Sequence, residues 1–155
     1  MREWTRRTAL ALAAGLGVLA ADAATAQESA LERNKRNVVA FYNMMINDGK
    51  PEEAFRLYGS GTYIQHNPTV PDGAPPVIAF FTQRKKDFPE ARSEIKRVIA
   101  EGDLVALHVH SRRKPDERGF AIVDIFRVDA NGKIVEHWDV VQPVPENPRN
   151  DNGMF

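Results

Sequence analysis

The chain has 155 residues, a length that one domain of ordinary size accounts for, and its 21 Lys and Arg balance its 21 Asp and Glu. That balance argues against a nucleic-acid-binding protein, which normally carries a basic excess, so we expect no nucleic-acid partner. The absence of cysteine excludes a disulfide scaffold, a thiol nucleophile and thiolate metal sites.

Residues 1–26 have the pattern of an export signal. Three arginines within the first seven residues precede an apolar run, and Ala24-Thr25-Ala26 offers a cleavage site. The pair Arg6-Arg7 resembles a twin-arginine signal, with an ordinary secretory signal or a retained anchor as alternatives. We therefore expect a periplasmic protein with no stable membrane insertion after processing.

The first half of the remaining chain predicts three helices and one short strand. Residues 31–47 carry apolar side chains at three- and four-residue spacing, and Asp48-Gly49 ends that helix. Residues 51–58 begin with a proline and two glutamates, which suit a helix N-terminus. Residues 62–65 indicate a brief strand, and a third helix follows from 75 to about 85.

The third helix ends in a compact basic run, Arg84-Lys85-Lys86. Cations are favourable at a helix C-terminus, where they meet the negative end of the dipole. The simplest interpretation is a solvated helix edge, and an anion site is the alternative.

The second half changes to a period of two, which is typical of strands. Residues 93–100, 104–113, 120–128 and 134–141 are rich in Val, Ile and Phe, while 143–155 indicates an irregular tail. Helices followed by consecutive strands predict an α+β fold, with helices packed on one face of a curved antiparallel sheet.

Three strings in this order resemble the SnoaL-like branch of the NTF2-like superfamily: YIQHNP at 63–68, VDIFRV at 123–128 and GKIVEHWD at 132–139. The likeness covers residues 31–142 and is strongest to bacterial proteins described as predicted SnoaL-like aldol-condensation enzymes. It implies a cone-shaped barrel in which three helices cap a curved, mostly antiparallel sheet around an apolar pocket. The family contains polyketide cyclases, steroid isomerases and many non-enzymatic binders, and such cones commonly dimerise through the sheet, so we expect a homodimer.

The strand 120–128 places a carboxyl group among apolar side chains. By alternation, Asp124 shares a face with Ile122 and Phe126, and burial there would raise its pKa. A neutral carboxyl can donate a hydrogen bond to a developing enolate, the role that an aspartic acid has in ketosteroid isomerase. The resemblance maps this oxyanion acid onto Asp124, and a structural aspartate is the alternative.

The last strand carries a second polar cluster. His137 and Asp139 are two residues apart and therefore point the same way. An imidazole near aspartates can shuttle protons at neutral pH, with Asp139 as its orienter. The alternative is a structural network that closes the pocket.

His66 lies at the end of the first short strand, before Asn67-Pro68. In the isomerase relatives a catalytic carboxylate base precedes a proline in this region. Because an amide cannot be a base, the resemblance makes His66 the candidate base, offset by one residue. A histidine that caps a turn is the alternative.

His108 and His110 share one face of the strand 104–113. If that face lines the pocket, four imidazoles would converge near Asp124 and Asp139, a collection that would also suit a divalent metal. The alternative is a polar outer face of the sheet.

We therefore expect an acid–base enzyme that needs no cofactor and acts on a small, apolar, carbonyl-bearing ligand by aldol condensation, cyclisation or isomerisation. His66 or His137 would be the base, Asp124 the acid and Asp139 the orienter. A non-enzymatic binding module is the first alternative, and a metal-dependent enzyme is the second. The residues expected to contact substrate are Tyr63, Asn67, His108, His110, Ile122 and Phe126.

Overall fold

The computed structural model describes residues 30–155. The predicted export signal at residues 1–26 therefore lies outside the described residues. Within residues 30–155, every helix is too short or too polar to cross a membrane.

The first helix runs over residues 30–42 in its described part and continues as the π-helix η1 (Asn43–Asn47). The wider turn is seen in the bond from the Asp48 N–H to the Asn43 carbonyl, at 3.0 Å. Gly49 then takes a positive φ of 67°, which favours glycine and ends the helical segment as predicted. The apolar stripe of this segment is buried against the sheet.

Two further helices and one strand complete the first half of the fold. Helix α2 (Pro51–Tyr58) begins at its proline. It is followed directly by β1 (Gly59–Gln65), which starts three residues earlier than the predicted strand. Helix α3 (Ala74–Asp87) extends the predicted third helix by one to two residues at each end.

The remaining strands are β2 (Arg92–Glu101), β3 (Leu104–Arg112), β4 (Phe120–Val128) and β5 (Ile134–Pro143). They form one five-stranded sheet in the order β1-β5-β4-β3-β2. The pairs β2–β3, β3–β4 and β4–β5 are antiparallel, and β1 joins β5 in parallel. The four predicted strands of this half are confirmed to within two residues at their ends.

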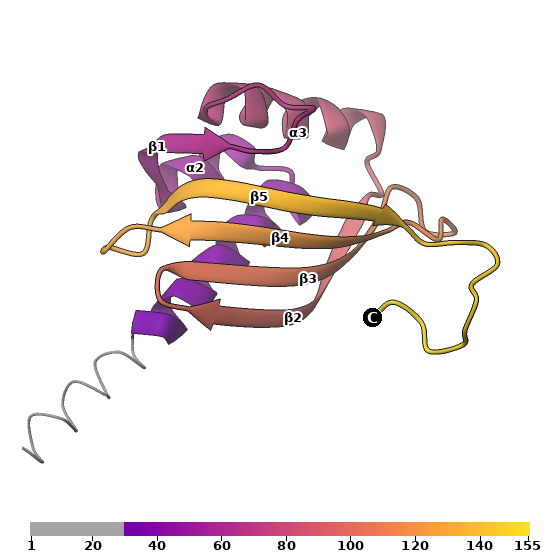
Figure 1. Cartoon of the computed structure of the whole chain (residues 1–155). Helices are drawn as coiled ribbons and strands as arrows, with labels where there is room; N and C mark the ends of the chain where they lie inside the picture. Colours follow the sequence, from indigo (N-terminus) through magenta and orange to yellow (C-terminus); the bar gives the residue numbers. More distant parts are fainter. Residues whose placement is uncertain (1–29) are drawn as a thin grey trace, which may run out of the picture.

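The helices lie on one face of the curved sheet, and α3 lies beyond the β1 edge (Figure 1). The core fills the space between, with Phe41 and Val38 of the first helix packed over β3 and β4. Val105, Leu107 and Val109 of β3 are fully buried in it. The α+β prediction, with three helices on a mostly antiparallel curved sheet, is therefore confirmed.

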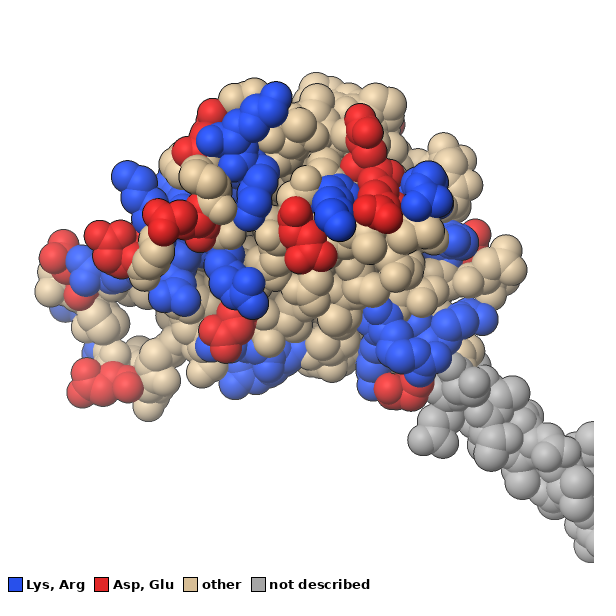
Figure 2. Space-filling model, turned by 180° about the vertical axis from the view of Figure 1, so that it is seen from behind, with Lys and Arg blue, Asp and Glu red and all other residues tan. Residues whose placement is uncertain are grey.

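The surface on the helical side carries acidic and basic side chains interspersed with one another (Figure 2). Some of them form pairs along the helices, such as Lys35 with Glu32 at 2.8 Å. The last residues, 144–155, contain no helix or strand. They return across the sheet, and the ring of Phe155 stacks on His110 with centroids 4.2 Å apart.

Candidate active site

A cavity of about 290 Å³ lies between the first helix, α3 and the concave face of the sheet. It is at the small end of the range for ligand pockets. Its wall is mostly apolar, with polar groups from β4 and β5 and from the end of α3. The lining residues are Tyr42, Met45, Ile46, Tyr63, Gln65, Asn67, Thr69, Val70, Phe80, Phe81, Arg84, Ser93, Ser111, Arg113, Phe120, Ile122, Asp124, Phe126, His137, Asp139 and Val141.

Strand register brings three of the predicted catalytic side chains to one end of this cavity. Asp124 of β4 pairs with Asp139 of β5, and Phe126 pairs with His137, so all four point to the concave side. This is the face that alternation predicts for them. Asp124, His137 and Asp139 offer ligand or proton-transfer atoms within 4.8 Å of one another.

Asp124 is buried, with 6% of its surface exposed. Its Oδ1 lies 3.1 Å from Nε2 of His137. Its Oδ2 is the one buried side-chain nitrogen or oxygen within residues 30–155 that lacks a hydrogen-bond partner. Burial raises the pKa of Asp124, and the nearby charge of Asp139 raises this pKa further, while the contacts with His137 and with the Tyr42 hydroxyl lower it. The site therefore contains a carboxyl oxygen that is free to meet a ligand.

The hydrogen bonds of Gln65 define the protonation of His137. Gln65 Oε1 accepts the backbone N–H of Asn67 at 3.0 Å, which identifies that side-chain atom as oxygen. The same Oε1 lies 2.9 Å from Nδ1 of His137, so Nδ1 must carry a proton. The contact between Nε2 and Asp124 Oδ1 then holds one shared proton, either as imidazole with a carboxylic acid or as imidazolium with a carboxylate.

Asn67 holds Asp139 in place. Its Oδ1 accepts the backbone N–H of Thr69 at 2.8 Å, which turns Nδ2 toward the carboxylate. Nδ2 donates to Oδ1 and Oδ2 of Asp139 at 2.9 and 2.7 Å. Asn67, predicted as a substrate contact, therefore lines the cavity and also positions a carboxylate.

Two tyrosine hydroxyls lie at the same end. Burial, followed by the charges of Asp124 and Asp139, raises the pKa of Tyr63 well above its usual range. Burial and the charge of Asp124 also raise the pKa of Tyr42. Both hydroxyls therefore keep their protons at neutral pH and can donate hydrogen bonds. The Tyr42 hydroxyl lies beside Ser93 and Asp124, and the Tyr63 hydroxyl lies beside Gln65.

His66 does not reach the cavity. It is partly exposed, its Nε2 lies 2.9 Å from Oε1 of Glu136, and its ring stacks on Trp138 at 4.8 Å. The cause is alternation along β1: Gln65 pairs with His137 and points inward, so the next residue points outward. The predicted convergence of His66 with Asp124 is therefore wrong, and Gln65 occupies the expected place.

His108 and His110 also lie outside the cavity. They alternate with Val105, Leu107 and Val109, which are buried on the concave side, so the histidines face the outer side of β3. There His108 Nδ1 contacts Arg97 at 2.9 Å, and His110 Nε2 lies 2.8 Å from the Arg118 carbonyl oxygen. The expected substrate contacts and the convergence of four imidazoles are wrong, because the apolar face of β3 is the one that packs.

The sequence does not place several polar side chains of the cavity at the site, among them Tyr42, Gln65 and Arg84. Tyr42 belongs to the apolar stripe of its helix, where it cannot be distinguished from an ordinary core residue. Gln65 could have been found by applying alternation to β1 and including its neighbours. Arg84 belongs to a run that the sequence favours as a solvated helix edge. The expected contacts Tyr63, Ile122 and Phe126 do line the cavity.

The cluster of Asp124, His137 and Asp139 has donor atoms of the kind that hold zinc or iron. An ion there would need the lone pair of His137 Nε2, because Nδ1 donates to Gln65. It would therefore replace the proton shared with Asp124. The donor types fit a metal ion, while the observed bonds satisfy the imidazole without one.

The cavity, the cone of strands and the capping helices together define the class of protein. A family model described as the SnoaL-like domain matches residues 38–137, more than half of the chain. The protein therefore belongs to the SnoaL-like family, within the NTF2-like superfamily, as the three sequence strings predicted.

Solved structures show the same fold. TsrD from Streptomyces laurentii is 18% identical, with a TM-score of 0.57 over 70% of this chain and 87% of that one. IdmH, a candidate polyketide cyclase from Streptomyces antibioticus, is 19% identical, with a TM-score of 0.57 over 70% and 91%. A candidate ketosteroid isomerase from Kribbella flavida is 17% identical, with a TM-score of 0.60 over 77% and 85%. No curated protein sequence matches the chain significantly.

Proposed function

We propose that the protein catalyses proton transfer at a carbon next to a carbonyl group of a small, largely apolar compound, without a cofactor. The observation that supports this best is Oδ2 of Asp124, a buried oxygen at the cavity without a partner among the described residues. A carboxylate whose pKa is raised by burial is a stronger base than an exposed one. The family to which the chain belongs includes cyclases and isomerases of this chemistry.

In the first step, Oδ2 of the ionised Asp124 takes a proton from the substrate carbon next to the carbonyl group. His137 meanwhile holds the shared proton on Nε2. The electron pair of the broken C–H bond forms an enolate, and its oxygen accepts a hydrogen bond from the hydroxyl of Tyr63 or Tyr42. Asp124 thus receives the base role expected of a histidine. The reason is that both nitrogens of His137 already have partners and His66 lies outside the cavity.

In the second step, Asp124 acts as the acid. For an aldol reaction, the enolate carbon bonds to a second carbonyl carbon, and the oxygen of that carbonyl takes the proton from Oδ2. For an isomerisation, the proton instead returns to another carbon of the conjugated system. Either route leaves Asp124 ionised again. This role differs from the resemblance-implied one, in which a neutral Asp124 donates a hydrogen bond to the enolate oxygen.

Asp139 supports this cycle as a positioning residue. Its negative charge, held by Asn67, lies opposite Asp124 and raises the pKa of that residue. A like charge at this place makes proton uptake by Asp124 more favourable.

The test measures exchange of the α-hydrogens of propiophenone, a neutral aryl ketone, in D₂O by proton NMR. We expect the wild type to accelerate exchange above the buffer rate. Asp124→Asn should lose about 100-fold or more of that acceleration, the usual scale for removing a general base. His66→Gln is the matched control, because this side chain lies outside the cavity, and it should retain exchange. Equal exchange by wild type and Asp124→Asn would contradict the assignment.

A non-enzymatic binding module is the alternative function for the same cavity. It predicts that propiophenone binds, with its resonances shifted by the protein, but that no α-hydrogen exchanges. Binding without exchange in the wild type would therefore replace the catalytic proposal with this one.

A further inference from the structure

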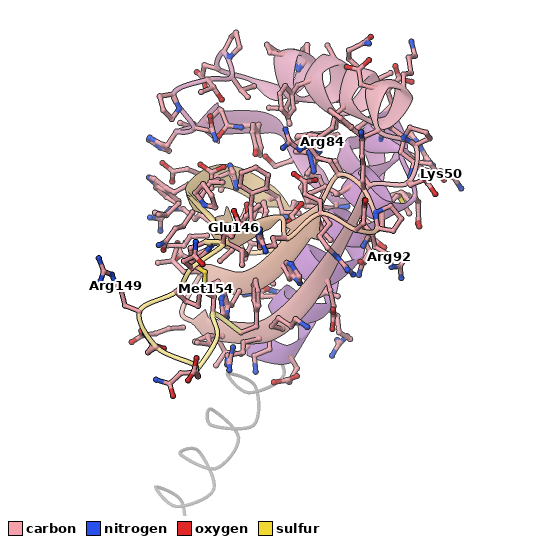
Figure 3. The ribbon with its side chains drawn as sticks, turned by 90° about the vertical axis from the view of Figure 1, so that its right-hand side faces the viewer. Lys50, Arg84, Arg92, Glu146, Arg149 and Met154 are labelled. Atoms are coloured by element: carbon pink, nitrogen blue, oxygen red, sulfur yellow. The ribbon has the colours of Figure 1, made fainter. Side chains whose placement is uncertain are left out.

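Arg84 turns away from the basic run in which the sequence places it. Lys86 of the same run is exposed, but Arg84 extends from the last turn of α3 toward the sheet (Figure 3) and lines the cavity. Its partner Ser111 lies opposite Phe120, four residues along β4 from Asp124, and Tyr42 lies between Arg84 and Asp124. The interpretation of a solvated helix edge is therefore wrong for Arg84, because its position on α3 faces β3.

The contacts of Arg84 leave most of its donors free. Nη2 donates to Oγ of Ser111 at 3.2 Å, and Ser111 in turn bonds Oγ of Ser93 at 2.9 Å. Both serines are buried and neutral. Arg84 is half-buried, and across residues 30–155 no carboxylate lies within 4.0 Å of its guanidinium, although a cation that loses part of its hydration is normally paired.

The carboxylate whose charge acts on Arg84, that of Glu117, already has a partner. Glu117 pairs with Arg113, whose Nη2 lies 2.6 Å from Oε1, and it also accepts the Arg113 backbone N–H at 2.8 Å. Burial lowers the pKa of Arg84 and the charge of Arg113 lowers it further, while Tyr42 and the charge of Glu117 raise it. A guanidinium stays protonated nonetheless, so this part of the cavity holds a positive charge without a direct carboxylate partner.

We propose that Arg84 binds a carboxylate of the substrate, so that the substrate is a keto acid with an apolar middle section. This inference rests on the proposed function, which places the carbonyl group at Asp124. The planar guanidinium matches a carboxylate, and a charge-assisted pair gains strength in a largely apolar cavity. The apolar section would lie along Ile122 and Phe120, between Arg84 and Asp124.

Strand geometry sets the scale of that ligand. Ser111, the partner of Arg84, lies opposite Phe120, and Asp124 is four residues further along β4. At the rise of a strand these two positions are roughly 13 Å apart, before the side chains reach toward each other. A carbonyl and a carboxylate separated by several methylene groups would span that distance.

The experiment uses two inert probes that differ in one group, 4-phenylbutanoate and 4-phenylbutanamide, in binding titrations by calorimetry. The wild type should bind the carboxylate about tenfold or more tightly than the amide, the scale of hydrogen bonds to charged groups. Arg84→Gln should abolish this preference. Arg92→Gln, which removes an exposed arginine on β2, should preserve it. A wild type without preference, or a preference that survives Arg84→Gln, would overturn the proposal.

The readout separates this proposal from the proposed function, because neither probe carries a ketone. Asp124→Asn should keep the carboxylate preference while losing exchange of propiophenone. If Asp124→Asn loses exchange of propiophenone but keeps the preference for the carboxylate probe, the result concerns the catalytic role of Asp124 alone. If Arg84→Gln fails to fold, Arg84→Lys takes its place in the test. Lysine retains the positive charge but cannot form two parallel hydrogen bonds to one carboxylate. Arg84→Lys should reduce the preference, and an unchanged preference would count against the pairing.

Discussion

His137 reaches Asp124 diagonally across two antiparallel strands, with 3.1 Å between Nε2 and Oδ1. The residue directly opposite Asp124 is Asp139, and His137 lies opposite Phe126. Diagonal neighbours on one face of a sheet are within reach of long side chains. The carboxyl group of Asp124 therefore contacts the imidazole of His137 and also lies next to the carboxyl group of Asp139.

The pH dependence of stability should reveal the burial of Asp124. Between about pH 4, where an unfolded aspartate titrates, and the raised pKa of folded Asp124, the folded state retains a proton that the unfolded chain has lost. The contribution of this residue is therefore fully present below pH 4 and is lost as the pH rises through the folded pKa. We expect the free energy of unfolding of the wild type, relative to Asp124→Asn, to fall from pH 4 to pH 7 in urea titrations. A difference that rises over this range would contradict the pKa direction.

Gln65 should be important for stability, although it is a polar residue near the end of a strand. Gln65→Ala removes the acceptor of both His137 Nδ1 and the Asn67 N–H. Leaving a buried donor without a partner costs about 1–3 kcal/mol, so the melting temperature should fall. Gln142→Ala, at an exposed position of β5, is the control and should melt like the wild type. Equal melting of the two variants would show that the Gln65 bonds contribute little.

Metal addition should inhibit the reaction. Zinc bound by Asp124, His137 and Asp139 would displace the proton shared by the first two and occupy the proposed base. We expect exchange of propiophenone by tag-free protein to survive chelator treatment and to fall when zinc is added. Loss of exchange with the chelator, followed by recovery with zinc, would instead support the metal-dependent enzyme.

The outer face of the sheet is the expected site of dimerisation. Val140 is 71% exposed and lies directly across from Val123, which is 41% exposed. Contiguous exposed apolar surface marks interaction sites, so we expect the partner to cover this cross-strand pair. We expect light scattering to give the mass of a dimer for the wild type and that of a monomer for Val140→Asp. Lys86→Asp on α3 is the control and should keep the mass of the dimer. A wild-type protein that is monomeric at every concentration would contradict the predicted dimer.

Alternation along single strands was sufficient to predict much of this protein. Every second residue of one strand faces the same side, so spacing alone assigned His137 and Asp139 to one face of β5 and Asp124 to the apolar face of β4. The register of β4 with β5 then brings these faces together. The apolar stripe of the first helix and the four later strands followed from periodicity in the same way. These are local properties, which neighbouring residues along the chain determine.

The tertiary structure decided what local patterns leave open. Whether the histidines of β3 face the cavity depended on which side the helices cover, and the valines and leucine of that strand took the covered side. The parallel pairing of β1 with β5 selected Gln65 rather than His66. The turn of Arg84 into the cavity depended on where α3 lies over the sheet. Each of these follows from packing between segments distant in sequence, which spacing within one segment does not encode.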